Sequence, residues 1–259
     1  MSEFYQKINK RFKWNNLWNY FKSAFKDIFH VVLGILIAVQ VNNWNEERKD
    51  RIGEQNYLHW LKVDLLKDQK NLLFSRDLCD IRMEQIDLLT QVLEHPDSII
   101  SEPNWFIESI EKVTWKSYLP ISTVVYDELQ NTGTMSLITS KTLREQLANY
   151  HDMATHWERI LKSLEYSNEF GNDTAGLLNK EILAQIENSE SLYMTHAPDP
   201  LNFNLSDQEV QTIVNSLNQS NAKKWLPQIN HYHVLSKKVV NLLISKNEEL
   251  LKTIDDNLD

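Results

Sequence analysis

The feature that most constrains this chain is an eighteen-residue stretch, 28–45, that contains no Asp, Glu, Lys or Arg. As an α-helix it would extend roughly 27 Å, which is close to the hydrocarbon thickness of a bilayer. Only Val31 to Val39 is continuously apolar, so a buried core helix is the competing interpretation. Aromatic residues on both sides, including Trp14, Trp18 and Trp44, are typical of membrane interfaces and favour a transmembrane helix.

The charge of the chain is distributed unevenly around this stretch. The formal net charge is −9, but residues 1–27 carry six basic and two acidic residues, which leaves −13 for the remainder. The basic tail, in which Leu17, Phe21, Phe25 and Ile28 recur at helical spacing, suits an amphipathic segment on anionic lipid. The acidic remainder would be repelled by phosphate, so we expect no nucleic-acid partner. The lipid bilayer is the one partner that this pattern indicates directly.

The rest of the chain is expected to be all-α. Only five glycines and six prolines occur in 259 residues, too few for the turns of a β-rich fold. We expect the membrane helix to continue to about residue 94 and to enter an antiparallel, coiled-coil-like bundle. The predicted parts are an interfacial tail (1–27), the transmembrane helix (28–45) and one bundle domain (46–259), with two compact domains as the alternative.

Apolar residues recur in three- and four-residue steps along the expected bundle helices. In the first helix, Asp68, Ser75 and Arg82 interrupt this series, while Leu66, Leu73, Leu78, Ile81 and Leu88 widen its apolar face, which points to bundle packing. Two further long helices are predicted over 141–164 and over 222–256, with Asn247 in the apolar phase of the last. Shorter helices are expected between Pro103 and Pro120, from a Thr123 cap to Leu129, and from a Ser206 capping box to Leu217. A helix over 177–186 is expected to resume after Gly171 and Gly176.

The sequence contains no motif that points to catalysis, a cofactor or a metal. His151 with His156, and His231 with His233, are too far apart around a helix for one metal, so each is interpreted as a surface or interface histidine. Gly171 and Gly176 have the G-x-x-x-x-G spacing of a phosphate loop, but the lysine and the hydroxyl residue that should follow are absent. Ser220 and Lys223 match S-x-x-K only by spacing. Cys79 lies on the apolar phase of its helix and is interpreted as packing, and Asp127 with Glu128 is interpreted as solvated surface. Catalytic, cofactor-binding and metal residues are therefore all predicted as none.

Two segments resemble an uncharacterised family of single-span proteins from Bacteroidota. They are the stretch from Val31 to Lys49, which contains Asn42-Asn-Trp-Asn-Glu46, and the stretch from Tyr126 to Ile138, where Asp127 replaces the glutamate usual in that family. The resemblance implies an inner-membrane protein with the helical domain in the periplasm, and it transfers no activity. Five basic residues before the span against four after it also favour a cytoplasmic N-terminus.

These features lead to two functional hypotheses of different classes. The first is a membrane-anchored scaffold that binds a partner protein or a second copy, and Gly34 with Ala38 would let two spans approach. The alternative is a sensory domain that binds a small molecule between helices, with Trp105, Trp115, Tyr118 and Tyr126 lining the pocket. An enzyme is not expected.

Overall fold

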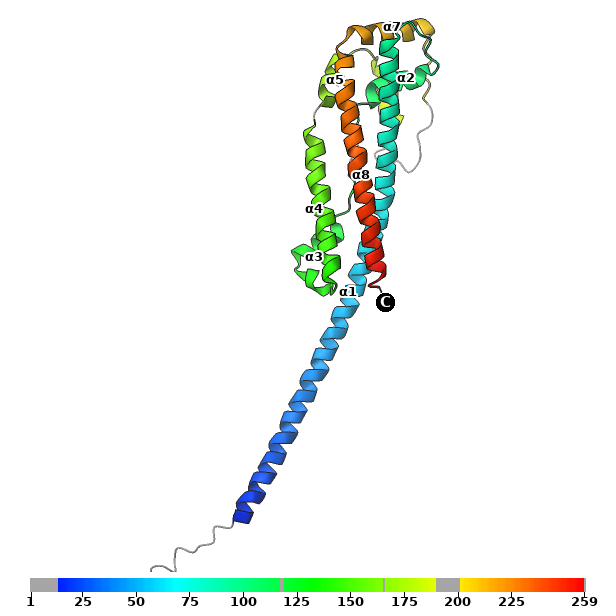
Figure 1. Cartoon of the computed structure of the whole chain (residues 1–259). Helices are drawn as coiled ribbons and strands as arrows, with labels where there is room; N and C mark the ends of the chain where they lie inside the picture. The colour runs from blue at the N-terminus through cyan, green and yellow to red at the C-terminus, as the bar shows by residue number, and fades with distance from the viewer. Residues whose placement is uncertain (1–13, 117–118, 165, 190–200, 259) are drawn as a thin grey trace, which may run out of the picture. The chain divides into compact units, whose positions relative to one another are not determined.

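The computed structural model describes residues 14–116, 119–164, 166–189 and 201–258, and within these ranges it consists of helices without strands. The all-α prediction is confirmed. By its contacts the chain divides into two units, Met1–Asn56 and Tyr57–Asp259. The helices shown in Figure 1 are α1 (Trp14–Glu94), α2 (Pro103–Lys112), α3 (Val124–Asn131), α4 (Lys141–Ser163), α5 (Tyr166–Thr174), α6 (Lys180–Ser189), α7 (Asp207–Gln219) and α8 (Leu226–Asp255), with 3₁₀ turns Thr134–Leu137 and Ala222–Lys224.

The described part of the first unit is a single helical segment of α1. The predicted long helix to residue 94 is confirmed, because α1 ends at Glu94 before Pro96. Every side chain from Ile28 to Ile52 is exposed. The predicted boundaries at residues 27 and 45 separate parts of the chain by their position in the membrane. Contacts within the chain do not test them, and they stay predictions.

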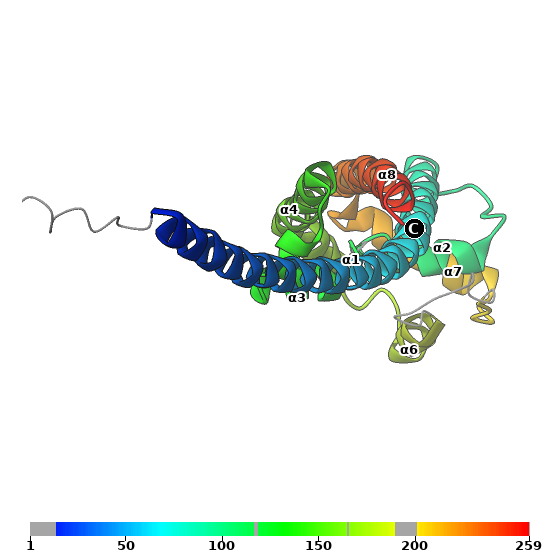
Figure 2. The same ribbon diagram turned by 90° about the horizontal axis from the view of Figure 1, so that it is seen from below.

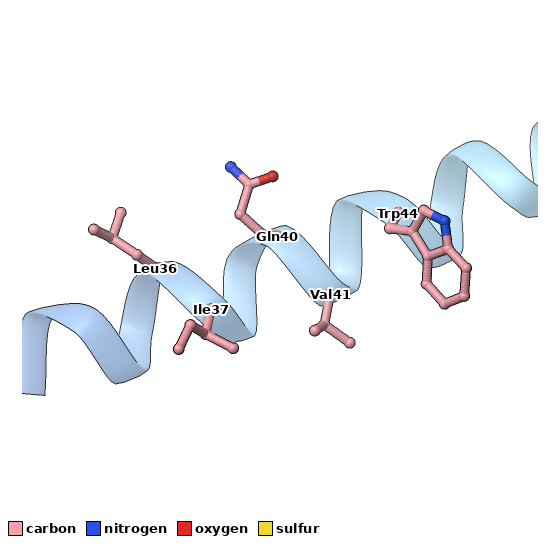
Figure 3. A pocket seen from close by; sticks show the side chains of 5 residues that line it. All are labelled: Leu36, Ile37, Gln40, Val41 and Trp44. Carbon is pink, nitrogen blue, oxygen red and sulfur yellow. The ribbon is translucent and has the colours of Figure 1, made fainter.

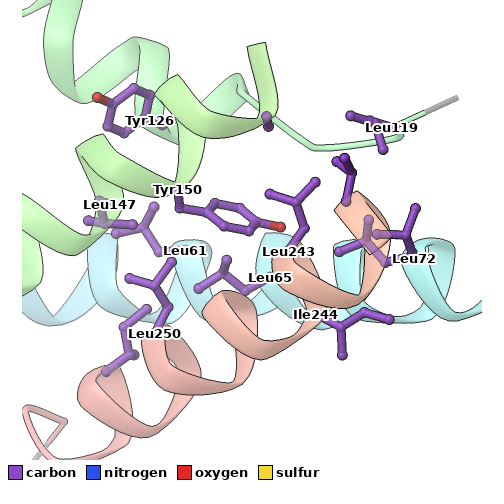
Figure 4. Close-up of a cluster of buried hydrophobic side chains, with 14 of the residues drawn as sticks. Leu61, Leu65, Leu72, Leu119, Tyr126, Leu147, Tyr150, Leu243, Ile244 and Leu250 are labelled. Carbon is purple, nitrogen blue, oxygen red and sulfur yellow. The ribbon is translucent and has the colours of Figure 1, made fainter. Parts of the chain in front are cut away.

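In the second unit, the part of α1 after Tyr57 packs with α4 and α8 around a first core (Figures 1 and 2). The α1 and α8 helices are antiparallel. Lys62 contacts Asp255 at 2.6 Å, and Asp80, which is later in α1, contacts Lys237, which is earlier in α8. Figure 4 shows how α1, α4 and α8 each contribute leucines or aliphatic residues to this core. Burying one such side chain contributes about 1.5–3 kcal/mol. The core residues labelled there include Leu61, Leu65, Leu72, Leu147, Leu243 and Leu250.

The remaining helices surround a second core in the same unit. The last turns of α1 contact α2, α6, α7 and the start of α8 through a separate group of buried residues. These include Ile86, Leu89, Phe106, Ile107, Phe170, Ile186, Val214 and Leu217. The bundle is therefore not one uniform coiled coil but two apolar cores in sequence along α1 and α8.

The three- and four-residue steps of α1 predict its buried face well. Leu58, Leu61, Leu65, Leu72, Cys79, Ile86, Leu89 and Leu93 are all buried, and so are the polar residues Asp68, Ser75 and Arg82 at the same phase. The prediction that the extra apolar residues widen the packed face is wrong for Leu66 and Leu73, which are 48% and 36% exposed. No helix of the described chain covers that side of α1.

Several predicted helix ends are confirmed and others are corrected. Ser140 and Ser206 cap α4 and α7, and Ser206 forms a complete capping box with Glu209. Thr123 precedes α3 as predicted, but its side chain makes no capping hydrogen bond. The predicted helix over 222–256 is interrupted, because a 3₁₀ turn ends at Lys224 and α8 begins only at Leu226.

The loops around α2 and α6 also differ from the prediction. The helix before Pro120 ends earlier, at Lys112. The expected helix over 177–186 begins at Lys180, because Gly176 adopts φ +82° and stops α5 from continuing. The Asn179 side chain then accepts hydrogen bonds from the backbone N–H groups of Glu181 and Ile182 at 3.0 and 2.9 Å, which caps α6.

Candidate functional site

The most distinctive surface of the first unit is the exposed apolar segment of α1. One described helix is long and apolar enough to cross a membrane, and its apolar window lies near the N-terminus with no residue buried. Val31, Leu33, Ile35, Leu36 and Ile37 are each 43–62% exposed. Water contact with so many large aliphatic side chains is unfavourable, so this surface requires another apolar environment.

A shallow hollow lies on this segment, shown in Figure 3. Leu36, Ile37, Gln40, Val41 and Trp44 line it, and all five come from consecutive turns of one helix. A surface formed by a single exposed helix cannot enclose a small molecule, whose binding sites are concave and bury most of the ligand. The hollow is instead a face onto which another helix or lipid chains can pack.

The first core of the second unit contains a buried polar layer formed by Asp68, Tyr150 and Asn247. Tyr150 donates its hydroxyl hydrogen to Asp68 Oδ2 at 3.2 Å, and Ser122 N–H donates to Asp68 Oδ1 at 2.8 Å. Asn247 Nδ2 donates to the Leu65 carbonyl oxygen at 2.9 Å and approaches the Tyr150 hydroxyl at 3.4 Å. Figure 4 shows the Tyr150 hydroxyl between Leu65 and Leu243. The layer joins α1, α4 and α8.

Burial dominates the electrostatics of this layer. Desolvation raises the pKa of Asp68 to about 7, although the hydrogen bonds from Ser122 and Tyr150 act in the opposite direction. Such a proton affinity would suit a general acid or base. However, Asp68 is only 1% exposed and its neighbours are core residues, so its proton is linked to the packing of the three helices.

A second group of buried polar residues involves α1 and α2, whose apolar residues contribute to the second core. Arg82 donates to Gln85 Oε1 at 3.0 Å, and Lys112 donates to Glu108 at 2.5 Å and to Ser189 at 3.1 Å. Both cations lie near the Trp115 ring, at 5.8 Å for Arg82 Cζ and 5.6 Å for Lys112 Nζ. The Glu108 carboxylate offsets the cost of burying Lys112, and the Trp115 face contributes for both cations. Apart from Arg82 in the apolar phase of α1, no sequence pattern indicates this group.

The structure changes the interpretation of two histidines. His156 and His231 are exposed as predicted, whereas the prediction is wrong for His151 and His233, which are buried. His151 stacks on Tyr126 with ring centroids 4.0 Å apart, and His233 Nε2 hydrogen-bonds the Val113 carbonyl oxygen at 2.9 Å. Desolvation lowers the pKa of each to about 4, so both are neutral at pH 7.

The remaining reactive side chains lie on different parts of the fold: Cys79 on α1, Asp127 and Glu128 on α3, and Ser220 after α7. Cys79 is buried, Asp127 and Glu128 are exposed, and the Ser220 side chain accepts a hydrogen bond from Ala222 N–H. Among the described residues, no group of three or more His, Cys, Asp or Glu side chains is placed to hold a metal ion. The prediction of no catalytic residue stays a prediction.

Two of the four aromatic residues proposed for a ligand pocket belong to different cores. Tyr126 is buried in the first core, whereas Trp115 packs against the second core. Trp105 is half-buried at the start of α2, and Tyr118 lies outside the described residues. Trp115 and Tyr126 therefore do not line one pocket, as the sensory hypothesis expected.

These observations define an all-helical chain with one candidate membrane-spanning helix and a packed helical unit. The chain belongs to the Family of unknown function (DUF6090), which matches residues 27–173 and therefore more than half of its length. The match begins at the apolar segment and ends within α5. No curated protein and no solved structure matches the chain.

Proposed function

We propose that the protein is a membrane-anchored helical scaffold, tethered by a single span at residues 28–45, whose domain binds other proteins. The observation that carries this proposal is the exposed apolar surface of α1 between Val31 and Val41. A core helix of a soluble protein would bury these side chains, whereas the segment buries none. The bilayer supplies the apolar environment that this surface requires.

The second unit adds an apolar strip on the outer side of α1, formed by Trp60, Val63, Leu66 and Leu73. These side chains are 36–62% exposed although the opposite side of the same helix is fully packed. Exposed aromatic and aliphatic side chains in a row are typical of protein-binding surfaces. In this proposal the strip binds a partner protein and the domain has no catalytic role.

The remaining parts of the proposal concern location. We place the protein in the inner membrane of a bacterium of the Bacteroidota, with a cytoplasmic N-terminus and a periplasmic domain. The support is the resemblance of the segment from Val31 to Lys49 and the small excess of basic residues before the span. A phosphatase reporter, active only in the periplasm, fused after Asp259 should be active. Activity of a cytoplasm-only fluorescent reporter at the same position would contradict this orientation.

Membrane attachment is tested by fractionating cells that express the full chain and washing the membranes with alkaline carbonate. We expect the chain to stay in the membrane pellet, and Leu36→Arg combined with Ile37→Arg to release it. Val124→Arg is the matched control, because Val124 is 72% exposed outside the apolar segment. Recovery of the wild-type chain in the carbonate supernatant would contradict the proposed anchor.

The binding role is tested by crosslinking in native membranes and mass spectrometry of the crosslinked species. Val63→Glu with Leu66→Glu should remove crosslinks that the wild-type chain and Val124→Glu retain. If the wild-type chain gives no reproducible crosslink to a protein or to a second copy, the scaffold proposal fails, whatever the outcome of the carbonate wash.

A further inference from the structure

Gln40 interrupts an otherwise apolar surface. Between Val31 and Val41 it is the single residue with a polar side chain, and its carboxamide projects from the helix beside Leu36, Ile37, Val41 and Trp44 (Figure 3). The neighbouring side-chain hydrogen bonds join Asn42 to Glu46 and His30 to the Lys26 carbonyl group, and neither engages Gln40.

The depth of Gln40 in the proposed span makes this carboxamide costly. The centre of residues 28–45 falls between Leu36 and Ile37, so Gln40 lies about 5 Å along the helix axis from the centre. The hydrocarbon half-thickness is about 15 Å, which places the side chain among lipid tails. A carboxamide in hydrocarbon without a hydrogen-bond partner loses the bonds that water would supply.

A second copy of the chain offers a partner of matching chemistry at the same depth. The carboxamide has a carbonyl acceptor and an N–H donor, so two such groups related by a twofold axis satisfy each other. In two parallel spans the symmetry-related Gln40 residues lie at equal depth. We propose that the span forms a parallel homodimer in which the Gln40 side chains hydrogen-bond across the helix interface, an inference that rests on the proposed membrane anchor.

The residues around Gln40 fit this geometry. Leu33, Ile37, Gln40 and Trp44 follow one another in alternating four- and three-residue steps, the spacing of a seam between two helices in a left-handed crossing. All four side chains are exposed and none is charged, so two copies meet there without like-charge repulsion. Packing of the aliphatic residues then adds to the amide pair.

The small residues Gly34 and Ala38 lie on another side of the helix. At 100° per residue, Gly34 is roughly 120° and Ala38 roughly 160° around the axis from Gln40. A close approach through these two residues would therefore use a different surface and would leave Gln40 facing lipid. This separation allows the two surfaces to be distinguished by single substitutions.

The test measures energy transfer between full-length chains labelled at the N-terminal amine with donor or acceptor and reconstituted together in phosphatidylcholine–phosphatidylglycerol vesicles. Dilution with lipid gives the association constant. We expect Gln40→Leu to weaken association by about threefold to tenfold, the range for one interhelical side-chain hydrogen bond. Gln40→Asn should retain most of it, and Gly34→Leu should leave it unchanged.

Each other outcome overturns the proposal. If Gln40→Leu and the wild-type chain associate equally, the Gln40 side chains do not hydrogen-bond across the interface. If Gly34→Leu alone loses association, the interface is formed by Gly34 and Ala38. A wild-type chain that stays monomeric at the highest protein density excludes the dimer. An alkaline wash of the same vesicles separates the two proposals, because a chain that stays bound but does not associate retains its anchor and loses only the dimer.

Discussion

The Tyr150 hydroxyl group donates a hydrogen bond to the Asp68 carboxyl group, although 82 positions separate the two residues along the chain. Both side chains are 1% exposed. Tyr150 also receives the weaker contact from Asn247, so one phenol connects a carboxyl group on α1 with a carboxamide on α8. The ionisation of Asp68 is thereby coupled to the contact among three helices.

Replacing Asp68 with Asn should remove one pH-dependent contribution to stability. The folded carboxyl has a pKa of about 7 and the unfolded one about 3.8, so the folded state holds the proton more tightly. Its stabilisation is complete below pH 4 and is lost as the pH rises towards 7. Asp68→Asn should raise the free energy of unfolding at pH 8 by up to about 4 kcal/mol. Denaturant titrations from pH 4 to 8 measure this.

The isosteric amide should preserve the geometry, since Asn can accept from Ser122 N–H and donate to the Tyr150 hydroxyl. Asp87→Asn, at an exposed carboxyl group on the same helix, is the control and should leave the pH profile unchanged. A parallel pH profile for Asp68→Asn and wild type would show that the buried carboxyl keeps an ordinary pKa.

Replacing His151 with Phe should reduce the loss of stability in acid. The unfolded imidazole gains a proton near pH 6.5, whereas the buried one does so only near pH 4. The resulting stabilisation is present above pH 6.5 and is lost as the pH falls towards 4, opposite in sign to the effect of Asp68. His151→Phe keeps an aromatic ring on Tyr126 and should abolish about 3 kcal/mol of this loss.

Thermal unfolding of His151→Phe at pH 4.5 and pH 7.5 measures the change, with exposed His156→Phe as the matched control. The difference in unfolding free energy between the two pH values should shrink for the first variant and stay constant for the second. If this difference in unfolding free energy is the same in His151→Phe and the wild-type chain, the histidine gains its proton as readily in the folded protein as in the unfolded one.

The two glycines near the end of α5 should respond to alanine in opposite directions. Gly176 has φ +82°, so alanine is strained there even though a Cβ atom would meet nothing within 4 Å. Gly171 lies inside α5, and its Cβ position is also open. Gly176→Ala should destabilise by about 1 kcal/mol and Gly171→Ala should stabilise by about 0.5–1 kcal/mol.

Because both sites are free of steric contacts, this pair isolates the backbone effect. Chemical denaturation of the two variants side by side is sufficient, and a destabilised Gly171→Ala protein would argue against a helical backbone at that position.

The sequence predicted the long helices and their buried sides because apolar residues repeat at a spacing set by helix geometry alone. The Ser206 capping box was predictable for the same local reason. Leu66 and Leu73 were misplaced since their exposure depends on which side of α1 the chain leaves uncovered. Tertiary contacts between distant segments decide that, and local spacing does not contain them.

The buried polar residues were the least predictable part of the molecule. In the sequence, Asp68 is only an interruption of an apolar series, and its partners Ser122 and Tyr150 follow 54 and 82 positions later. Lys112 and Glu108 gave no signal, although their four-residue separation allows an ion pair on one helix. Polar burial depends on a matching group from another element, which a periodic pattern cannot reveal.

The Asp68 layer also has a consequence for folding. Helices with repeating leucines can pack in several alignments, each shifted by seven residues along the axis, that bury similar apolar area. A shift of α8 by seven residues would place Val240 or Ile254 where Asn247 now meets the Tyr150 hydroxyl, and would leave Asn247 against aliphatic side chains. Asp68, Tyr150 and Asn247 therefore select one alignment of the helices among competitors that hydrophobic burial alone would scarcely separate.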